Sequence, residues 1–231
     1  IAFIQPGIYD DLDATLRIMD AASLSVVNTF NYPAVSSASN TEFIPHVSWQ
    51  TDSQSLKVGI PDKDLVYADD TALTTLWQFG IDGSQTQLNT LQASFFTVPQ
   101  WSDDGAYMFY MRHKGAISEN LYELMIAEGD GSNPVVYITG TSGTLGLPQW
   151  IPDSHQFIFP QYQAGELWIG QPAKPETPFT NANFIVNFIS SSIYLYGSGT
   201  PDNYTLYYGD LNSLSSTPIA RLPVPSPFGY D

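Results

Sequence analysis

The chain contains 231 residues, of which 43% are hydrophobic and 14% aromatic, enough to bury the core of one all-β domain. Its net charge of −16 comes from seven lysines and arginines against 23 aspartates and glutamates, and this balance argues against nucleic acid, which requires a basic face. The lack of cysteine excludes disulfides, thiol nucleophiles and thiolate zinc sites. No apolar run reaches about 18 residues, so the sequence predicts no membrane span.

A short element that begins with tryptophan and contains aspartate recurs along the chain. Its three full copies start at Trp49, Trp101 and Trp150, at spacings of 52 and 49 residues. Each copy precedes a short alternating apolar run, which predicts a strand entered through a tight turn. An aspartate in such a turn accepts a hydrogen bond from a backbone N–H two residues on. We therefore assign structural roles to Trp49, Asp52, Trp101, Asp104, Trp150 and Asp153.

Leucine followed by an aromatic residue marks a third strand in each unit. These pairs are Leu76-Trp77, Leu121-Tyr122, Leu167-Trp168 and Leu206-Tyr207, with Leu16 to Met19 in the same place. Because the aromatic residues occupy matching places, we expect them to pack between neighbouring sheets. Hairpin signals follow, most clearly Asp82-Gly83-Ser84 and Asp130-Gly131-Ser132, and lead into a fourth strand. Four strands in each unit of about 40 to 50 residues are typical of a β-propeller blade.

The two ends of the chain carry complementary parts of the repeat. The C-terminal segment Phe228-Gly229-Tyr230-Asp231 is spaced like a tryptophan and aspartate element that lacks its second half. We therefore assign structural roles to Phe228 and Asp231. Residues 1–4 look like the strand that should follow such an element. We therefore predict five blades, with the ring closed by a C-terminal strand that joins the N-terminal blade and removes two exposed edges. The alternative is a piece of a longer propeller. The predicted blades are residues 1–38 with 224–231, then 39–91, 92–140, 141–181 and 182–223.

The best copy of the repeat resembles a known family. Pro99-Gln100-Trp101-Ser102-Asp103-Asp104-Gly105, the strand after it, and the Asp130-Gly131 hairpin are similar to the repeat of TolB-like, WD-repeat-like bacterial β-propellers. The resemblance covers nearly the whole chain and implies a propeller fold. Such repeats occur in periplasmic scaffold proteins, in propeller domains of serine peptidases and in polysaccharide lyases, so the fold does not fix the function.

Binding residues are sought where the repeat is broken or where connections are long. The connections at 61–74 and 112–120, between second and third strands, are the best surface candidates, because loops on a rigid scaffold carry binding. His46 is placed on an inner strand beside the expected channel. Tyrosines outside the repeat, namely Tyr162, Tyr194, Tyr196, Tyr204 and Tyr230, are the residues that a stacking surface would use. The binding candidates are therefore His46, Arg112, His113, Tyr162 and Tyr204.

No catalytic or metal site emerges from the sequence. The three histidines are scattered, and no GxSxG elbow is present, which argues against serine hydrolysis. A glycosidase or lyase needs two facing carboxylates, which the expected inner strands lack. Acidic loops at 10–13 and 62–64 offer oxygen ligands for calcium, but neither matches an EF-hand, so we expect solvated loops and no cofactor.

The interpretation that follows is a non-catalytic binding or assembly scaffold. Its partner is expected to be a protein or a neutral glycan, because an acidic surface repels polyanions and anionic membranes. Low lysine content, many small polar residues and isoleucine at position 1 favour an extracytoplasmic location. A carbohydrate-active enzyme and the propeller domain of a serine peptidase remain the alternatives.

Overall fold

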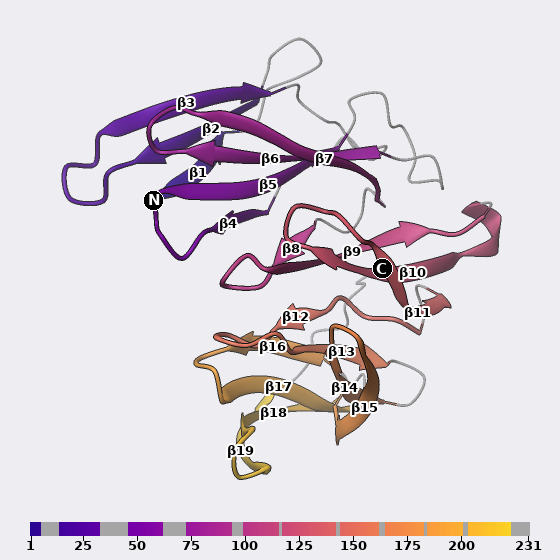
Figure 1. Ribbon diagram of the computed structural model, residues 1–231. Coiled ribbons are helices and arrows are strands. Elements are labelled where there is room, and N and C mark those ends of the chain that lie inside the picture. Colours follow the sequence, from indigo (N-terminus) through magenta and orange to yellow (C-terminus); the bar gives the residue numbers. More distant parts are fainter. Residues whose placement is uncertain are drawn as a thin grey trace, which may run out of the picture. The chain divides into compact units, whose positions relative to one another are not determined.

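The computed structural model describes residues 1–5, 14–32, 46–61, 73–93, 99–115, 117–141, 144–161, 165–182, 184–200 and 203–222. These residues form nineteen β-strands and one short 3₁₀ helix, Ile117–Glu119. The strands build five antiparallel sheets that follow one another along the chain (Figure 1). The expected all-β class of antiparallel, mostly four-stranded sheets is confirmed.

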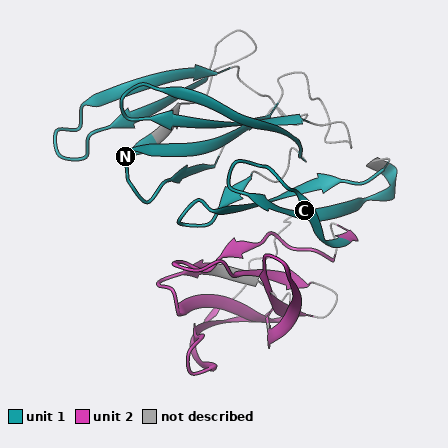
Figure 2. Ribbon diagram, viewed as in Figure 1, with its two compact units in different colours: residues 1–139 teal, residues 140–231 magenta. Residues whose placement is uncertain are grey.

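Sheets 1, 2 and 3 belong to the first of two compact units, residues 1–139, drawn in teal in Figure 2. Sheet 1 contains β1 (Ala2–Gln5), β2 (Ala14–Met19) and β3 (Val26–Tyr32). Sheet 2 contains β4 (Val47–Trp49), β5 (Ser55–Pro61), β6 (Leu73–Gly80) and β7 (Gln85–Gln92). Sheet 3 contains β8 (Gln100–Trp101), β9 (Tyr107–His113), β10 (Leu121–Glu128) and β11 (Val135–Thr141), whose last two residues fall in the second unit.

Sheets 4 and 5 form most of the second unit, residues 140–231, drawn in magenta in Figure 2. Sheet 4 contains β12 (Gln149–Trp150), β13 (Phe157–Gln161), β14 (Glu166–Gln171) and β15 (Lys174–Asn181). Sheet 5 contains β16 (Phe184–Phe188), β17 (Ile193–Thr200), β18 (Asn203–Asp210) and β19 (Ser215–Leu222). In all five sheets each strand pairs with its neighbour in sequence, so every sheet is a simple meander.

The first turn of sheets 2 and 3 is organised by an aspartate. Asp52 Oδ1 accepts a hydrogen bond from the Gln54 amide at 2.8 Å, and Asp104 Oδ1 accepts one from the Ala106 amide at 3.0 Å. Sheet 4 closes the same turn differently, because Asp153 itself has a positive φ of 56° and the Ser154 hydroxyl accepts a hydrogen bond from the Gln156 amide. The aspartate therefore accepts a hydrogen bond from the turn in sheets 2 and 3, whereas in sheet 4 it supplies the residue with positive φ.

Aspartates also shape the turn before the last strand of sheets 1 and 2. Asp82 Oδ1 accepts hydrogen bonds from the Ser84 amide at 2.9 Å and the Ser84 hydroxyl at 2.7 Å, and Asp20 is bonded in the same way by Ser23. Hydrogen bonds from these serines lower the pKa of both carboxyls below the ordinary value. The turns therefore use ionised carboxylates as acceptors at neutral pH.

A backbone hydrogen bond joins the two turns at the same end of a sheet. Ile81 N donates to Gln54 O in sheet 2, Gly129 N donates to Ala106 O in sheet 3, and Leu211 N donates to Ser192 O in sheet 5, each at 2.8 Å. The first and second hairpins of a sheet are thereby held together, and their outer pairs of strands cannot splay apart.

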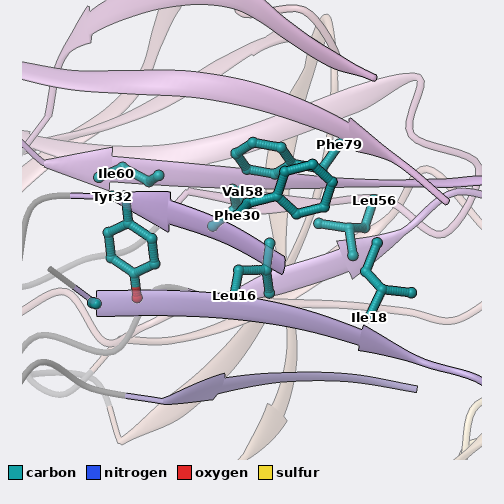
Figure 3. Packing of buried hydrophobic residues seen from close by; sticks show 9 residues of the cluster. Leu16, Ile18, Phe30, Tyr32, Leu56, Val58, Ile60 and Phe79 are labelled. Atoms are coloured by element: carbon teal, nitrogen blue, oxygen red, sulfur yellow. The ribbon is translucent and has the colours of Figure 1, made fainter. Parts of the chain in front are cut away.

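Sheets 1 and 2 pack face to face through apolar side chains that alternate along their strands. The cluster in Figure 3 joins Leu16 and Ile18 of β2 with Leu56 and Val58 of β5, all at most 2% exposed. Burying each such side chain contributes about 1.5–3 kcal/mol, so this interface supplies much of the stability of the pair.

The same arrangement recurs in the rest of the described chain. Between sheets 2 and 3, Leu76 packs with Met108 and Met125, and between sheets 4 and 5, Leu167 packs with Tyr194 and Tyr196. Leu76 and Leu167 are fully buried. Sheets 2 and 4 therefore depend on the following sheet to cover the leucine of their third strand.

One expected equivalence within the repeat is wrong. In sheet 2, the residue six positions after Asp52 is Val58, and it pairs with Trp77. In sheet 3, the residue six positions after Asp104 is Tyr110, and it pairs with Met125 and not with Tyr122. Tyr122 lies three residues earlier and pairs with His113. The prediction was misled because a leucine and an aromatic residue, Leu121 and Tyr122, also stand at the start of β10. The flexible side chain of Met125 fills the space between sheets that an aromatic ring fills elsewhere.

Lys57 of β5 is buried at 8% exposure and links sheet 2 to sheet 3. Its ammonium donates to Gly105 O and Gly129 O, each at 3.0 Å, and Trp101 Nε1 donates to the same Gly129 carbonyl at 2.9 Å. Burial lowers the pKa of Lys57, although the charges of Asp130 and Asp104 act in the opposite direction. A cation thus holds both turns of the neighbouring sheet.

We expect Lys57→Met to lower the free energy of unfolding by about 1–3 kcal/mol, because Gly105 O loses a charged donor in a buried place. Urea unfolding followed by tryptophan fluorescence measures the change. Lys174→Met, at an exposed lysine of β15, is the matched control and should change stability by less than about 0.5 kcal/mol. Equal stability of the two variants would show that the Lys57 contacts contribute nothing.

Candidate functional site

The connection between the second and third strands of sheet 3 is the described part of the chain that the sequence marked for binding. It runs from the end of β9 through the 3₁₀ helix Ile117–Glu119 to β10, and only Ala116 in it lies outside the described residues. Arg112 and His113 are the last two residues of β9, so the ladder with β10 fixes their positions.

Glu123 is clamped between two basic side chains at this place. It lies directly opposite Arg112 across the strands, and its Oε2 accepts from Arg112 Nε and Nη2, each at 2.7 Å. Lys114 Nζ lies 2.9 Å from Oε1 of the same carboxylate. The Glu123 side chain is 5% exposed, whereas those of Arg112 and Lys114 are 33% and 53% exposed. The carboxylate is therefore an internal anchor, and the two cations are its solvent-facing parts.

The protonation state of Glu123 follows from these contacts. Burial raises the pKa of this carboxyl, but the hydrogen bonds and charges of Lys114 and Arg112 together outweigh burial and bring the pKa below its ordinary value. Glu123 is therefore ionised at neutral pH and holds both basic side chains in place.

His113 lies beside this clamp and is 2% exposed. Its Nδ1 is 3.1 Å from Gly115 O, and because a carbonyl only accepts, Nδ1 carries a proton and donates it in this hydrogen bond. Among the described residues, Nε2 has no hydrogen-bond partner, and the ring of Tyr122 meets the imidazole edge-on with centroids 4.8 Å apart. His113 is thus a packed core residue at the end of β9.

The other binding candidates do not join this cluster. His46 precedes β4, and the residue as a whole is exposed. Partial desolvation of its imidazole lowers the pKa of His46. Tyr204 is partly buried on β18 in the second unit, where it pairs with Gly199 and Leu222. Tyr162 lies outside the described residues, as do Phe228 and Asp231.

Two of the tyrosines proposed for a stacking surface are core residues instead. Tyr194 and Tyr196 are 3% and 4% exposed, and their rings stack with centroids 5.4 Å apart. Tyr207 continues the stack against Tyr196 at 5.1 Å. Burial raises the pKa of Tyr194, and the nearby Tyr196 and Asp210 add to the increase. Alternation along β17 turns these rings toward sheet 4, so the expectation that they stack on a ligand is wrong.

Sequence reasoning missed Glu123 and Lys114 as parts of the cluster. The signal was present, since a glutamate in one strand and an arginine in the next form a cross-strand pair when the register places them opposite each other. Only the register, which pairs Arg112 with Glu123, selects this partner from the 23 acidic residues of the chain.

Within the described residues of the first unit, aspartates and the basic pair lie at opposite ends of the sheets. The turns between first and second strands and before the last strand of sheets 2 and 3 lie at one end, with the β2–β3 turn of sheet 1, and they carry the exposed carboxylates of Asp20, Asp52, Asp82, Asp104 and Asp130. Arg112 and Lys114 lie at the opposite end, about 20 Å away along β9 at 3.3 Å per residue. At that opposite end the described chain also carries the exposed Glu119, and the charges of Arg112 and Lys114 are paired with Glu123.

No three histidine, aspartate or glutamate side chains within the described ranges are grouped so that they could hold a metal ion. The acidic loops at 10–13 and 62–64, which were weighed for calcium, lie outside those ranges. In the same described ranges, no helix is long and apolar enough to cross a membrane.

Comparison with known proteins identifies the fold. No family model matches the sequence, and no curated protein matches it. Among solved structures, TolB from Acinetobacter baumannii superposes with a TM-score of 0.56 at 13% identity, over 90% of this chain and 49% of that one. The β-propeller domain of the Trilobed protease from Pyrococcus furiosus gives 0.61 at 17% identity, over 90% and 62%.

An oligogalacturonate lyase from Vibrio parahaemolyticus gives a TM-score of 0.61 at 14% identity, over 95% of this chain and 62% of that one. The chain thus spans between about half and three fifths of the length of these three structures. Identities this low carry information on architecture alone. Together with the five antiparallel meanders, they show that the chain has a β-propeller fold.

Proposed function

We propose that the protein is a non-catalytic binding or assembly module, located outside the cytoplasm, that takes a protein partner or a neutral glycan. The observation that carries the proposal is the state of four of the described carboxylates. Asp20, Asp82 and Asp130 accept hydrogen bonds from serines in their own turns, and Glu123 is neutralised by two cations. All four have pKa values below the ordinary range, whereas a general acid needs a raised one.

The proposed scaffold is a ring of five blades with the boundaries given by the repeat, closed by residues 224–231 beside β1. Closure would cover a face that the described sheets leave partly open. Leu206 of sheet 5 is partly exposed, whereas the matching residues Leu76 and Leu167 are fully buried under the next sheet. Sheet 1, in turn, has three described strands where the others have four. A further strand and a covering sheet would complete both.

Two alternatives keep the fold and change the function. The similar structures include oligogalacturonate lyases, an acylaminoacyl peptidase and the β-propeller domain of a protease. The first alternative is therefore a carbohydrate-active enzyme, and the second is the propeller domain of a serine peptidase. In either case the chain would form part of a longer propeller or a larger protein. These alternatives predict turnover of polygalacturonate or of peptides by the whole protein, and the scaffold predicts none.

The scaffold is tested by affinity capture from the extracellular fraction of the source cells, with the purified chain as bait. We expect a partner that is retained at a physiological salt concentration and released by free chain. A double variant of the basic pair, Arg112→Gln with Lys114→Gln, reports whether the partner contacts that end. Turnover of polygalacturonate or of a peptide library, with no partner captured, would overturn the scaffold.

Ring closure predicts the cost of truncating Leu206. If a sheet covers this face, Leu206→Ala should lower the free energy of unfolding about as much as Leu167→Ala, roughly 2–4 kcal/mol, because both leave a cavity. Urea unfolding of the two variants measures this. A cost below about 1 kcal/mol for Leu206→Ala, beside a full cost for Leu167→Ala, would show that the face is open and would contradict the five-bladed ring.

The Glu123 clamp predicts a defined pH dependence. At pH 7, Glu123→Gln should lower the free energy of unfolding by about 1–3 kcal/mol, because Arg112 and Lys114 lose a buried partner. Since the folded pKa of Glu123 lies below the ordinary 4.5, its contribution is present above pH 4.5 and disappears as the pH falls through the folded value.

Urea unfolding of both proteins at pH 7 and at about pH 3.5 measures this difference. We expect the stability gap between the native chain and Glu123→Gln to narrow at the lower pH. A gap that is unchanged, or that widens on acidification, would show that the ion pairs do not stabilise the fold.

A further inference from the structure

The two most exposed of the large hydrophobic side chains in the described chain are Leu214 and Leu24, at 76% and 67%. Each stands in the turn before the last strand of its sheet, Leu24 between β2 and β3 and Leu214 between β18 and β19. These turns share the sequence Asp-x-x-Ser-Leu-Ser, at residues 20–25 in sheet 1 and 210–215 in sheet 5. The same turn therefore places a leucine in solvent in each of the two compact units.

The side-chain hydrogen bonds of the two turns are made by an aspartate and two serines. Asp20 Oδ1 accepts from the Ala22 amide at 3.1 Å, and Asp210 Oδ1 accepts from the Asn212 amide at 2.9 Å. The first serine of each turn donates to the same aspartate, and its hydroxyl lies 2.8 Å from that of the second serine in sheet 1 and 2.7 Å in sheet 5. The turn is therefore held by these polar residues, and the leucine side chain takes no part in it.

Both leucines have an unfavourable backbone conformation. Their φ angles are 55° and 51°, in the left-handed region where Cβ crowds the following carbonyl oxygen. The turns before the last strand of sheets 2 and 3 place Gly83 and Gly131 at positive φ, where glycine is free of this clash. A bulky apolar side chain that is both strained and exposed contributes little to folding, and strained residues concentrate at functional sites.

A further aliphatic side chain is exposed beside each leucine. In sheet 1, Val26 follows the turn and is 48% exposed. In sheet 5, Ile189 of the first turn is 61% exposed, and the backbone bond between the two turns of this sheet holds it at the same end as Leu214. Each turn is thus the tip of a small apolar patch.

We propose that these two turns, residues 20–25 and 210–215, are contact points for a partner protein, and that Leu24 and Leu214 insert into apolar pockets on its surface. A few buried anchors carry most of the affinity of a protein interface, while the polar residues around them exclude water. The aspartate and serines of each turn supply such a polar rim. This inference rests on the proposed binding function and names the residues that meet the partner.

A lipid surface is a poorer occupant of the same turns. Membrane binding grows with the apolar area that is buried and with attraction to anionic lipids. Hydrogen bonds from the amide and hydroxyl of Ser23 lower the pKa of Asp20, so an ionised carboxylate stands beside Leu24 at neutral pH. Anionic lipids repel this carboxylate, whereas a basic side chain of a partner protein can meet it.

A second copy of the chain is also a poorer occupant. Each copy carries a net charge of −16, so two copies repel each other at low and moderate salt. A partner protein with a neutral or basic rim around its pockets meets no such repulsion.

Site-specific cross-linking tests the contact directly. A diazirine analogue of leucine replaces Leu24 or Leu214, one at a time, and the chain is irradiated in the extracellular fraction of the source cells. We expect both positions to attach to the same protein, because each side chain lies in a pocket of that protein. The control position is Leu147, which is 57% exposed and lies outside the strands, and it should not attach to that protein.

The attached protein then serves as the probe for affinity. Leu24→Gly with Leu214→Gly should weaken its binding by at least about tenfold, as expected when the anchors of an interface are truncated. Leu147→Gly should leave the affinity unchanged. The double variant should keep or raise its urea midpoint, because glycine relieves the strain at positive φ. This combination separates a role in binding from a role in the fold.

Several results would overturn the proposal. They are attachment of no protein at 24 and 214, attachment of lipid or of a second copy in place of a partner, and an unchanged affinity of the double variant. A lowered urea midpoint would assign the leucines to the fold and would also count against the site. Attachment at one position alone would remove the other turn from it.

Failure of this site and failure of the scaffold are distinguishable. If the native chain captures a protein that the double variant binds equally well, the two turns are excluded and the scaffold proposal stands. If the native chain captures no protein at all, both proposals fail.

Discussion

The structure depends on the burial of the third strand of one sheet beneath the next sheet. A four-stranded meander has two faces and cannot exclude water from the apolar residues of either face alone. Leu76 and Leu167 are fully buried because Met108 and Met125 in one case, and Tyr194 in the other, cover them from the following sheet. The repeat in the sequence thus produces a repeated interface between neighbouring sheets, and each sheet is stabilised by packing against its neighbour.

The polar contacts of the described chain serve this packing. Aspartates hold the turns, a backbone bond between Gly129 and Ala106 ties the two turns of sheet 3 together, and Lys57 reaches from sheet 2 to bind both. The acidic turns collect at one end as a result of the meander, while the Glu123 clamp presents Arg112 and Lys114 at the other. The strand order thus places the described aspartates of the turns and the Glu123 clamp at opposite ends of the strands.

Much of the fold could be predicted because residues with strong turn preferences stand at the turns. Trp101 and Asp104, and the Asp130-Gly131 hairpin, mark strand ends that the structure places in one antiparallel meander. The pairing of Met125 with Tyr110 could not be predicted in this way. Sequence similarity between repeats shows which residues are alike, whereas the strand register decides which residues lie opposite each other.

The candidate site was less predictable than the fold. Arg112 and His113 were identified from their loop, but the burial of His113 and the partner of Arg112 depend on the ladder between β9 and β10. Lys57 was overlooked because a lone lysine in an alternating strand usually indicates a solvated face. Its burial arises from two carbonyls contributed by a sheet that begins about 40 residues later, which no local pattern reports.

The stacking of sheets is tested most directly by a double-mutant cycle across the interface between sheets 2 and 3. Leu76→Ala, Met108→Ala and the double variant are compared by urea unfolding. Because the two side chains share one buried cluster, the account predicts a coupling free energy of about 0.5–3 kcal/mol. Additive effects, with coupling below about 0.3 kcal/mol, would contradict the account, since the two residues would then not form a common core.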